Sequence, residues 1–315
     1  MTNKRRLTGL AGAVVLGFSL SGCGLFGAGN SSDPVLATVN GQAITNSSWL
    51  QSIDGLGVLQ GQKLSTTTAN KKSQVKQLMI WSAVEQWTLA HHLITKKTAQ
   101  QQAQKLLTQL ETSAGSKATL THDLKGYGLT LPQFSSFLTQ QQILQVAFNK
   151  ETAHVPVPSV TAEQQFYNQN KTQFMNPQSD QVQVILVKSQ TEASSIEAQL
   201  KGGANFATLA KKDSIDPSKA QGGELGNVPV STQSGMPTNF VNVMSGLKAG
   251  QYGVASTPSG YYVMQVQKVN PPAEQAFTAV EASIKTYLQN NSKNQAFQSW
   301  GTRIEKQYKT QFLMK

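Results

Sequence analysis

Apolar residues recur at three- and four-residue spacing through the first half of the chain, a pattern that predicts amphipathic helices. The first such helix is expected over residues 70–95, and a second over 96–112 with Thr95 as its N-cap. A third should open at the capping box Thr130-Leu131-Pro132-Gln133. The stripe of the first helix consists of Ile80, Val84, Trp87, His91 and Ile94. The stripe of the third consists of Phe134, Phe137, Leu138, Leu144 and Phe148.

Shorter signals surround these helices. Residues 36–45 alternate around Asn40-Gly41, a dipeptide typical of a hairpin turn. Val155-Pro156-Val157-Pro158 predicts a stiff, non-helical linker, because the residue before a proline avoids the helical region. After it, Thr161-Ala162-Glu163-Gln164 is expected to cap a helix that runs to about Phe174.

The pattern changes from Gln181 onward. Residues 182–187 are almost continuously apolar and predict a buried strand. Expected next are helices near 191–201, 204–212 and 237–247, and a strand at 261–268. A long helix should follow Pro271-Pro272; its stripe is Phe277, Val280, Ile284, Leu288, Phe297, Trp300 and Ile304. A helical region interrupted by an α/β module predicts an α+β protein with an inserted domain, whose last helix packs on the first helices.

Composition limits the chemistry. The 315 residues suggest two domains, and a 38% hydrophobic share excludes wholesale disorder. A single Cys excludes an intramolecular disulfide framework and a multi-thiolate zinc site, and nothing in the sequence calls for a cofactor or a metal. His91 and His92 are adjacent, so on a helix they diverge by about 100° and are poorly placed to chelate one ion.

The N-terminus is typical of an exported protein. Lys4, Arg5 and Arg6 precede an apolar run that is too short to span a bilayer, so residues 1–22 are expected to be a signal peptide. Leu20-Ser21-Gly22-Cys23 resembles a bacterial lipobox, which predicts lipid attachment at Cys23; the alternative is a buried Cys after an ordinary signal. Residues 23–33 are rich in Gly, Ser and Asn and predict a flexible tether. We therefore expect an extracytoplasmic protein anchored to the cell membrane. The chain carries a net charge of +11, but export argues against nucleic acid as a partner.

Two parts of the chain resemble one family. Residues 39–45 (VNGQAIT), followed by helices, are similar to the N-terminal chaperone domain of the PrsA and SurA foldases. Residues 179–268 resemble a parvulin-type (PpiC) peptidyl-prolyl isomerase domain. Its landmarks here are Ile185-Leu186-Val187, Gly203-Ala204-Asn205-Phe206-Ala207, Ser214-Ile215-Asp216-Pro217, Gly222-Gly223-Glu224-Leu225-Gly226 and Thr257-Pro258-Ser259-Gly260-Tyr261. The resemblance implies a discontinuous helical chaperone domain, residues 34–178 and 269–315, with an inserted parvulin-like domain that has a small antiparallel sheet.

The resemblance also implies a site. The family's proline pocket corresponds to Leu225, Met236 and Phe240, and Met236 and Phe240 would share one helical face if the local chain is helical. Alternatively, the three are ordinary core residues. The catalytic positions correspond to Asp216, Tyr262, Thr257 and Ser259. The family usually carries a histidine at the positions of Val184 and Tyr262, and residues 179–268 contain none.

The chemistry implied is rotation about X–Pro bonds, which interconvert slowly enough to limit folding. A catalyst of this reaction needs an apolar pocket and preferential binding of the twisted amide, but neither a nucleophile nor a metal. Two interpretations stay open. In one, the protein is a membrane-anchored foldase that binds secreted, unfolded chains and isomerises their X–Pro bonds, with Tyr262 replacing one imidazole function. In the other, it is a non-catalytic holdase with a pseudo-parvulin domain. The sequence leaves its oligomeric state open.

Overall fold

The computed structural model describes residues 33–231 and 234–314, so the predicted signal peptide and Cys23 lie outside the described residues. The chain divides into two compact units, which are described separately. Unit 1 comprises the chain up to Pro158 together with Thr286–Lys315, and unit 2 is the continuous segment Ser159–Lys285. The domain boundaries expected from sequence, at residues 178 and 269, stay a prediction about which segments fold independently.

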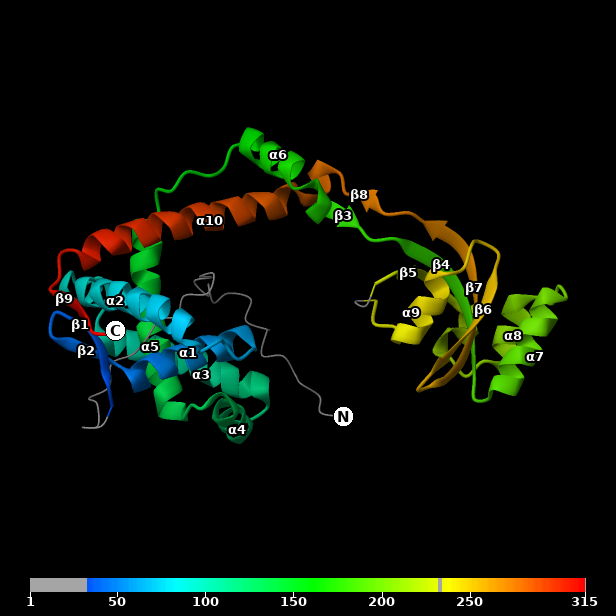
Figure 1. Ribbon diagram of the computed structural model, residues 1–315, viewed down its shortest axis with the longest axis horizontal. Helices are drawn as coiled ribbons and strands as arrows, with labels where there is room; N and C mark the ends of the chain where they lie inside the picture. The colour runs from blue at the N-terminus through cyan, green and yellow to red at the C-terminus, as the bar shows by residue number, and fades with distance from the viewer. Residues whose placement is uncertain (1–32, 232–233, 315) are drawn as a thin grey trace. The chain divides into compact units, whose positions relative to one another are not determined.

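Unit 1 is helical with a small sheet (Figure 1). Its elements are β1 (Val35–Val39), β2 (Gln42–Thr45), α1 (Asn46–Gln60), α2 (Thr68–Ala90), α3 (Lys96–Ala114), α4 (Lys117–Tyr127), α5 (Leu131–Glu151), the C-terminal part of α10 (Phe277–Glu305) and β9 (Thr310–Phe312). The predicted hairpin is present. Asn40 and Gly41 both have positive φ, 52° and 80°, as a two-residue hairpin turn requires. The other edge of β1 pairs with β9, so the two ends of the described chain share one antiparallel sheet.

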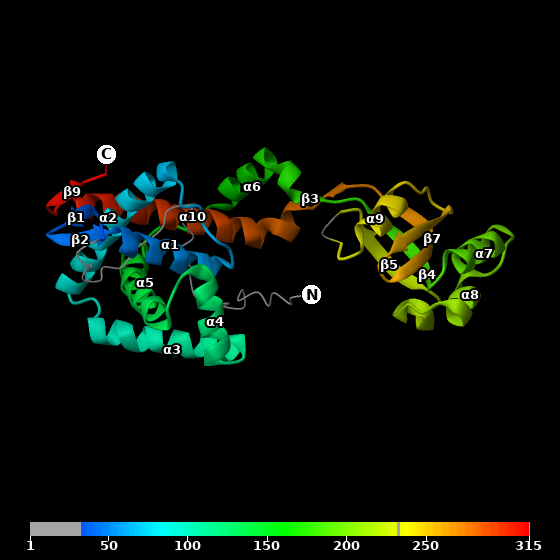
Figure 2. The same cartoon turned by 60° about the horizontal axis from the view of Figure 1, so that its bottom comes forward.

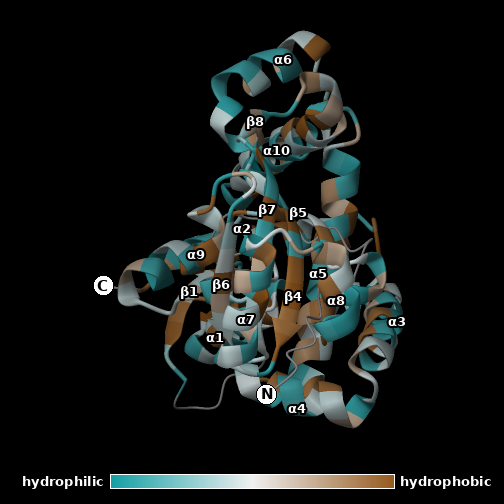
Figure 3. Ribbon diagram, turned by 90° about the vertical axis from the view of Figure 1, so that its right-hand side faces the viewer, coloured by the Kyte–Doolittle hydropathy of each residue, from teal (hydrophilic) through white to brown (hydrophobic). Residues whose placement is uncertain are grey.

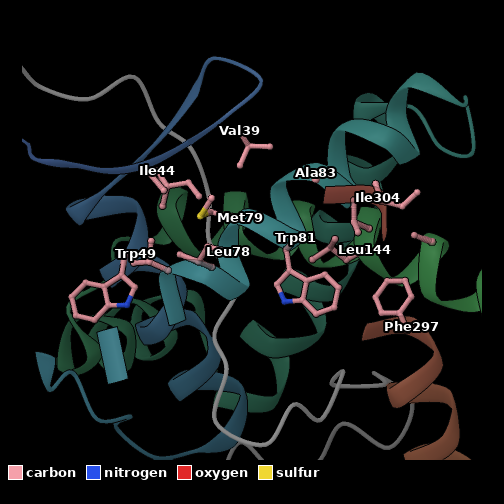
Figure 4. Close-up of a cluster of buried hydrophobic side chains, with 14 of the residues drawn as sticks. Val39, Ile44, Trp49, Leu78, Met79, Trp81, Ala83, Leu144, Phe297 and Ile304 are labelled. Carbon is pink, nitrogen blue, oxygen red and sulfur yellow. The ribbon is translucent and has the colours of Figure 1, made fainter. Parts of the chain in front are cut away.

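Aromatic side chains join α10 to α2. The ring of Trp81 stacks on Phe297 at 5.2 Å, and Trp87 meets Trp300 edge-on at 5.0 Å. Figure 4 shows Trp81 and Phe297 within one buried cluster to which β1, β2 and α5 also contribute. The expectation that the last helix packs on the first helices is therefore confirmed.

Helix caps account for most of the predicted boundaries. Oγ1 of Thr95 accepts the amide of Thr98 at the start of α3, and Thr130 and Gln133 form the capping box of α5. The sequence pattern did not predict α1. This helix contains Gly55 and Gly57, which lower helix propensity. Gly55 is required by packing, because a Cβ there would lie 2.7 Å from the ring of Phe137.

Unit 2 is built on a four-stranded antiparallel sheet in the order β5-β4-β7-β6. Its elements are α6 (Val160–Gln169), η1 (Lys171–Phe174), β3 (Met175–Asn176), β4 (Ser179–Val187), α7 (Gln190–Lys201), α8 (Phe206–Asp213), η2 (Pro217–Gln221), β5 (Glu224–Pro229), α9 (Thr238–Ser245), β6 (Tyr252–Thr257), β7 (Gly260–Asn270), β8 (Ala273–Glu274) and the start of α10. The α+β class and the small antiparallel sheet are confirmed.

The two faces of this sheet carry different helices (Figure 2). Val184, Leu186 and Tyr262 face α9, whereas Ile185 and Val263 face α7 and α8. Because both faces of β4 are covered, its second half is apolar at every position, as its colour in Figure 3 shows.

The helix that follows the Val155–Pro158 segment starts earlier than predicted. Ser159, and not Thr161, is the N-cap of α6, since its hydroxyl accepts the amide of Ala162. The helix ends at Gln169, and the predicted continuation to Phe174 is the short 3-10 helix η1. No helix in the described ranges is long and apolar enough to cross a membrane.

A buried acid on β4 gives a testable property of unit 2. Asp180 is fully buried; its Oδ1 accepts from Gln178 at 3.2 Å, and its Oδ2 has no hydrogen-bond partner. Burial raises the pKa of this carboxyl. The folded state therefore binds its proton more tightly than the unfolded state, so this contribution to stability is lost as pH rises through the raised pKa.

Asp180→Asn should consequently stabilise unit 2 at pH 7, by about 1 kcal/mol or more, because it removes the charge while keeping the shape. At a pH below the ordinary value of 3.8, variant and parent should be equally stable, which provides the internal control. The measurement is amide hydrogen exchange of residues 179–187 at both pH values. Equal protection of the two proteins at pH 7 would contradict the prediction.

Candidate functional site

Asp216 is held in place by the segment that precedes it. The hydroxyl of buried Ser214 accepts the amides of Leu186 and Asp216, both at 3.1 Å. The amide of Ile215 donates to the carbonyl of Leu186 at 2.9 Å, so this segment is fixed to β4. Asp216 then caps η2, where its Oδ1 accepts the amide of Ser218 at 2.9 Å. Its other oxygen, Oδ2, remains available to a side chain.

Tyr262 supplies that side chain. It lies on β7 opposite Leu186 and Ala255, and its hydroxyl donates to Oδ2 of Asp216 at 3.3 Å. Its ring, only 8% exposed, packs edge-on against Phe240 at 5.3 Å. Burial, followed by the negative charge of Asp216 and the hydrogen bond to it, raises the pKa of Tyr262. The hydroxyl is thus a neutral donor across the physiological pH range.

The three expected pocket residues pack in the same cluster as Tyr262, beneath and around α9. Phe240 has no exposed surface, whereas Leu225 and Met236 are only partly buried. The latter two are therefore the side chains with surface left for a ligand, and Phe240 supports them from inside. Met236 is not on a shared helical face with Phe240, because α9 begins at Thr238 with Pro237 as its N-cap.

Thr257 is the last residue of β6, and Ser259 lies in the turn between β6 and β7. Oγ1 of Thr257 donates to the carbonyl of Gly260 at 2.9 Å and accepts the amide of Ser259 at 3.3 Å. Thr257 pairs with Gly260 and lies two residues beyond Ala255, so the register puts it on the Tyr262 face of the sheet. Both hydrogen bonds stabilise the turn, and among the described residues no hydrogen bond joins either side chain to Asp216 or Tyr262.

The structure thus brings Tyr262 into contact with both Asp216 and Phe240. The Thr257 hydroxyl and the backbone amide of Ser259 stabilise the turn instead. Ser214 has a role that could not be predicted from the sequence. It is a lone hydroxyl two positions before Asp216, and its buried position could not be distinguished from a surface serine without the fold. Within the described ranges, three or more His, Cys, Asp or Glu side chains nowhere gather as a metal site would require.

Known proteins are similar to this chain in sequence. Residues 158–282 match the family described as "PPIC-type PPIASE domain". A protein named foldase protein PrsA from Clostridium kluyveri is 29% identical over 95% of this chain and 96% of its own length. The chain is PrsA-like and carries a PpiC-type domain. A PrsA protein from Clostridium botulinum is 31% identical, and there the match spans about half of each chain.

Solved structures similar to this PrsA-like chain include a SurA-like chaperone of Campylobacter jejuni, with a TM-score of 0.42, 24% identity, and coverage of 89% of this chain and 100% of the other. PrsA from Bacillus anthracis matches with a TM-score of 0.32, 20% identity, and coverage of 71% and 94%.

Two positions, Val184 and Tyr262, separate this PrsA-like chain from the parvulin pattern described above, and Val184 is the apolar one. Val184 occupies a usual histidine position, and its side chain is fully buried under α9 beside Met264, its partner on β7. Val184 therefore contributes apolar packing at a position where the parvulin pattern has an imidazole ring that forms hydrogen bonds. The polar part of the site therefore depends on the pair of Tyr262 and Asp216.

Proposed function

We propose that unit 2 accelerates cis–trans isomerisation of X–Pro bonds in unfolded chains. The observation that carries the proposal is the hydrogen bond from Tyr262 to Asp216, formed directly beside the ring of Phe240. A neutral donor thereby lies next to an apolar surface that Leu225 and Met236 leave partly open. The apolar surface suits the proline ring, and the neutral donor suits the amide that precedes it.

The mechanism follows from the electronic structure of the amide. Rotation faces a barrier of about 18–20 kcal/mol because resonance is lost at the midpoint. In the twisted state the prolyl nitrogen regains its lone pair and becomes a hydrogen-bond acceptor. When the Tyr262 hydroxyl turns from Asp216 to this nitrogen, it stabilises the twisted state more than the planar one. Asp216 holds the hydroxyl in place before and after the turnover, and Leu225 and Met236 hold the ring.

The decisive experiment compares two neighbouring tyrosines. Tyr262→Phe should lower the isomerisation rate of a proline peptide by about a hundredfold, the low end of what a preorganised hydrogen-bond donor contributes. Tyr261→Phe is the matched control, because Tyr261 lies on the opposite face of β7 and packs towards α7 and α8; its rate should be unchanged. The rate can be measured by NMR exchange at pH 5.5, 6.5 and 7.5.

Between these pH values we expect no change of the kind that a titrating imidazole produces, because the raised pKa of Tyr262 keeps the hydroxyl protonated throughout. Equal rates for the two variants would remove Tyr262 from the mechanism. An absence of acceleration by the parent protein at any pH would overturn the proposal itself.

A second candidate is a non-catalytic holdase, which the apolar, fully buried Val184 favours because it removes one polar group from the site. In that case unit 2 binds extended, proline-containing chains through Leu225 and Met236 without turning them over. Suppression of client aggregation by a parent protein that shows no isomerase activity would identify this function.

The same proposal places the protein outside the cytoplasm, attached to the cell membrane through a lipid on Cys23 after removal of residues 1–22. It rests on the Leu20–Cys23 motif and on the likeness to PrsA foldases. Its clients are newly secreted, partly unfolded proteins with X–Pro bonds, and unit 1 is the chaperone part. Mass spectrometry of the N-terminal peptide from the producing cell tests the anchor: a diacylglyceryl adduct on Cys23 is expected, and an unmodified thiol would exclude it.

A further inference from the structure

The two units differ in charge. After residue 22, unit 1 contains 15 Lys and Arg and 7 Asp and Glu, a net charge of +8. Unit 2 contains 9 of each and is neutral. The net positive charge of the chain after residue 22 therefore belongs entirely to unit 1.

The basic side chains of unit 1 are also more exposed to solvent than its acidic side chains. Of the 14 Lys and Arg of unit 1 that the structure describes, 12 are exposed, whereas none of its seven Asp and Glu is. The ion pairs found among the described residues, such as Lys171 with Glu274, all lie in unit 2. Lys63, Lys96 and Lys306 lie near the carboxylates of Asp54, Glu85 and Glu305, but no ion pair is found for the other exposed cations among the described residues of unit 1. These other cations remain available to an external anion.

Some of these cations lie where the described chain begins. The carbonyl of Pro34 accepts the amide of Asn46, whose side chain accepts from the ammonium of Lys71. Lys71 also lies over the ring of Trp49 at 4.5 Å. The next residue, Lys72, and Lys76 one turn later are both exposed and share a face of α2. The nearby carboxylate of Asp33 is bound by the amide of Ser47 at 3.0 Å.

Apolar side chains are exposed at the same place. Lys76 lies 5.5 Å from the ring centre of Phe312 at the end of β9. The next residue, Leu313, donates its amide to the carbonyl of Leu36 and is 50% exposed. Val35, which precedes Leu36 on β1, is 43% exposed. Lys72, Lys76, Val35 and Leu313 together form what we call the basal surface.

We propose that the basal surface docks on the headgroups of an anionic lipid membrane, with the lysines on phosphate and Val35 and Leu313 entering the interface. The proposal rests on the lipid anchor proposed above. The ten residues from Gly24 to Asp33 reach at most about 35 Å, and they enter unit 1 at this surface. A tethered unit is thus kept within reach of the bilayer, where each Lys contributes about 1 kcal/mol. Exposed apolar residues among the lysines favour a lipid interface over a soluble polyanion.

The test uses the chain from residue 24 onward, which carries no lipid and retains every described residue. It should bind vesicles containing phosphatidylglycerol but not pure phosphatidylcholine vesicles, with affinity that falls as salt rises. Replacing both lysines (Lys72→Gln with Lys76→Gln) should weaken vesicle binding about tenfold or more. The matched control is Lys105→Gln with Lys117→Gln, which removes the same charge from exposed positions of α3 and α4. It should weaken binding by about threefold or less.

Equal losses for the two double variants, or equal binding to both vesicle types, would overturn the proposal. Tight binding to soluble polyphosphate without vesicle binding would also overturn it and identify a polyanion site instead. Thermal unfolding of both variants verifies that they are folded. These outcomes are independent of the proposed function, because the lipid on Cys23 is detected by mass and the isomerase rate is measured without vesicles.

Discussion

Replacing Gly223 by alanine is expected to unfold the sheet of unit 2. Gly223 has a φ of 88°, and a Cβ there would lie 2.4 Å from the carbonyl oxygen of Val184. This oxygen belongs to the backbone of the central strand β4, and the carbonyl of Gly223 accepts the amide of Val184 at 2.8 Å, so neither group can move without breaking the pair. We expect a loss of about 4 kcal/mol or more, at the upper end of single-residue effects.

The control for this prediction is Gly203→Ala. Gly203 also has positive φ, 92°, but a Cβ there would meet nothing within 4 Å. It should cost only the backbone strain of about 1–2 kcal/mol. Hydrogen exchange of residues 179–187 reports the stability of unit 2 in both variants. Similar losses of stability in the two variants would show that the backbone strain at Gly223, and not its close approach to β4, determines the loss for Gly223→Ala.

Truncating Phe297 is expected to have the largest effect on unit 1. The side chain is fully buried on α10, and its ring lies 5.2 Å from those of both Trp81 and Phe148 and 5.4 Å from that of Trp300. Phe297→Ala should therefore leave a cavity between three aromatic rings and lower the free energy of unfolding by about 3–5 kcal/mol. Urea denaturation followed by tryptophan fluorescence measures it.

Tryptophan fluorescence reports on unit 1 alone, because all four tryptophans of the chain belong to unit 1. Gln295→Ala, at an exposed position two residues earlier on α10, serves as the control and should change stability by less than about 0.5 kcal/mol. A loss below 1 kcal/mol for Phe297→Ala would mean that α10 is not part of the core of unit 1.

Sequence signals predicted the elements whose ends are determined by contacts between residues close together in the sequence. Asn40-Gly41, Thr95 and the capping box at Thr130 each act within four residues, and their elements were predicted at or near the observed bounds. The helix α1 was missed because Gly55 is required by a contact with Phe137, far away in the sequence. The strand β9 was missed for a similar reason, since three residues form a strand only when β1 is present to pair with them.

In the candidate site, too, some features could be predicted from the sequence and others depend on how the chain folds. The resemblance of residues 214–217 and 257–261 to the parvulin pattern pointed to Asp216 and Tyr262, and the structure has their side chains in contact. The position of Met236 ahead of α9 could not be predicted from its spacing to Phe240, because it depends on Pro237 acting as the N-cap. The burial of Ser214 depends on how its segment packs against β4.

The pairing of β1 with β9 also determines the order in which the protein can be completed during synthesis. Neither this pair nor the contact of Phe297 with Trp81 can form until the last segment of unit 1 has been made, after all of unit 2. Unit 2 is one continuous segment and can fold while the strand partners of unit 1 are still missing. Once folded, it shortens the loop that unit 1 must close, which lowers the entropy cost of closure. A folded unit 2 thus reduces the entropy that the chain must lose to complete unit 1.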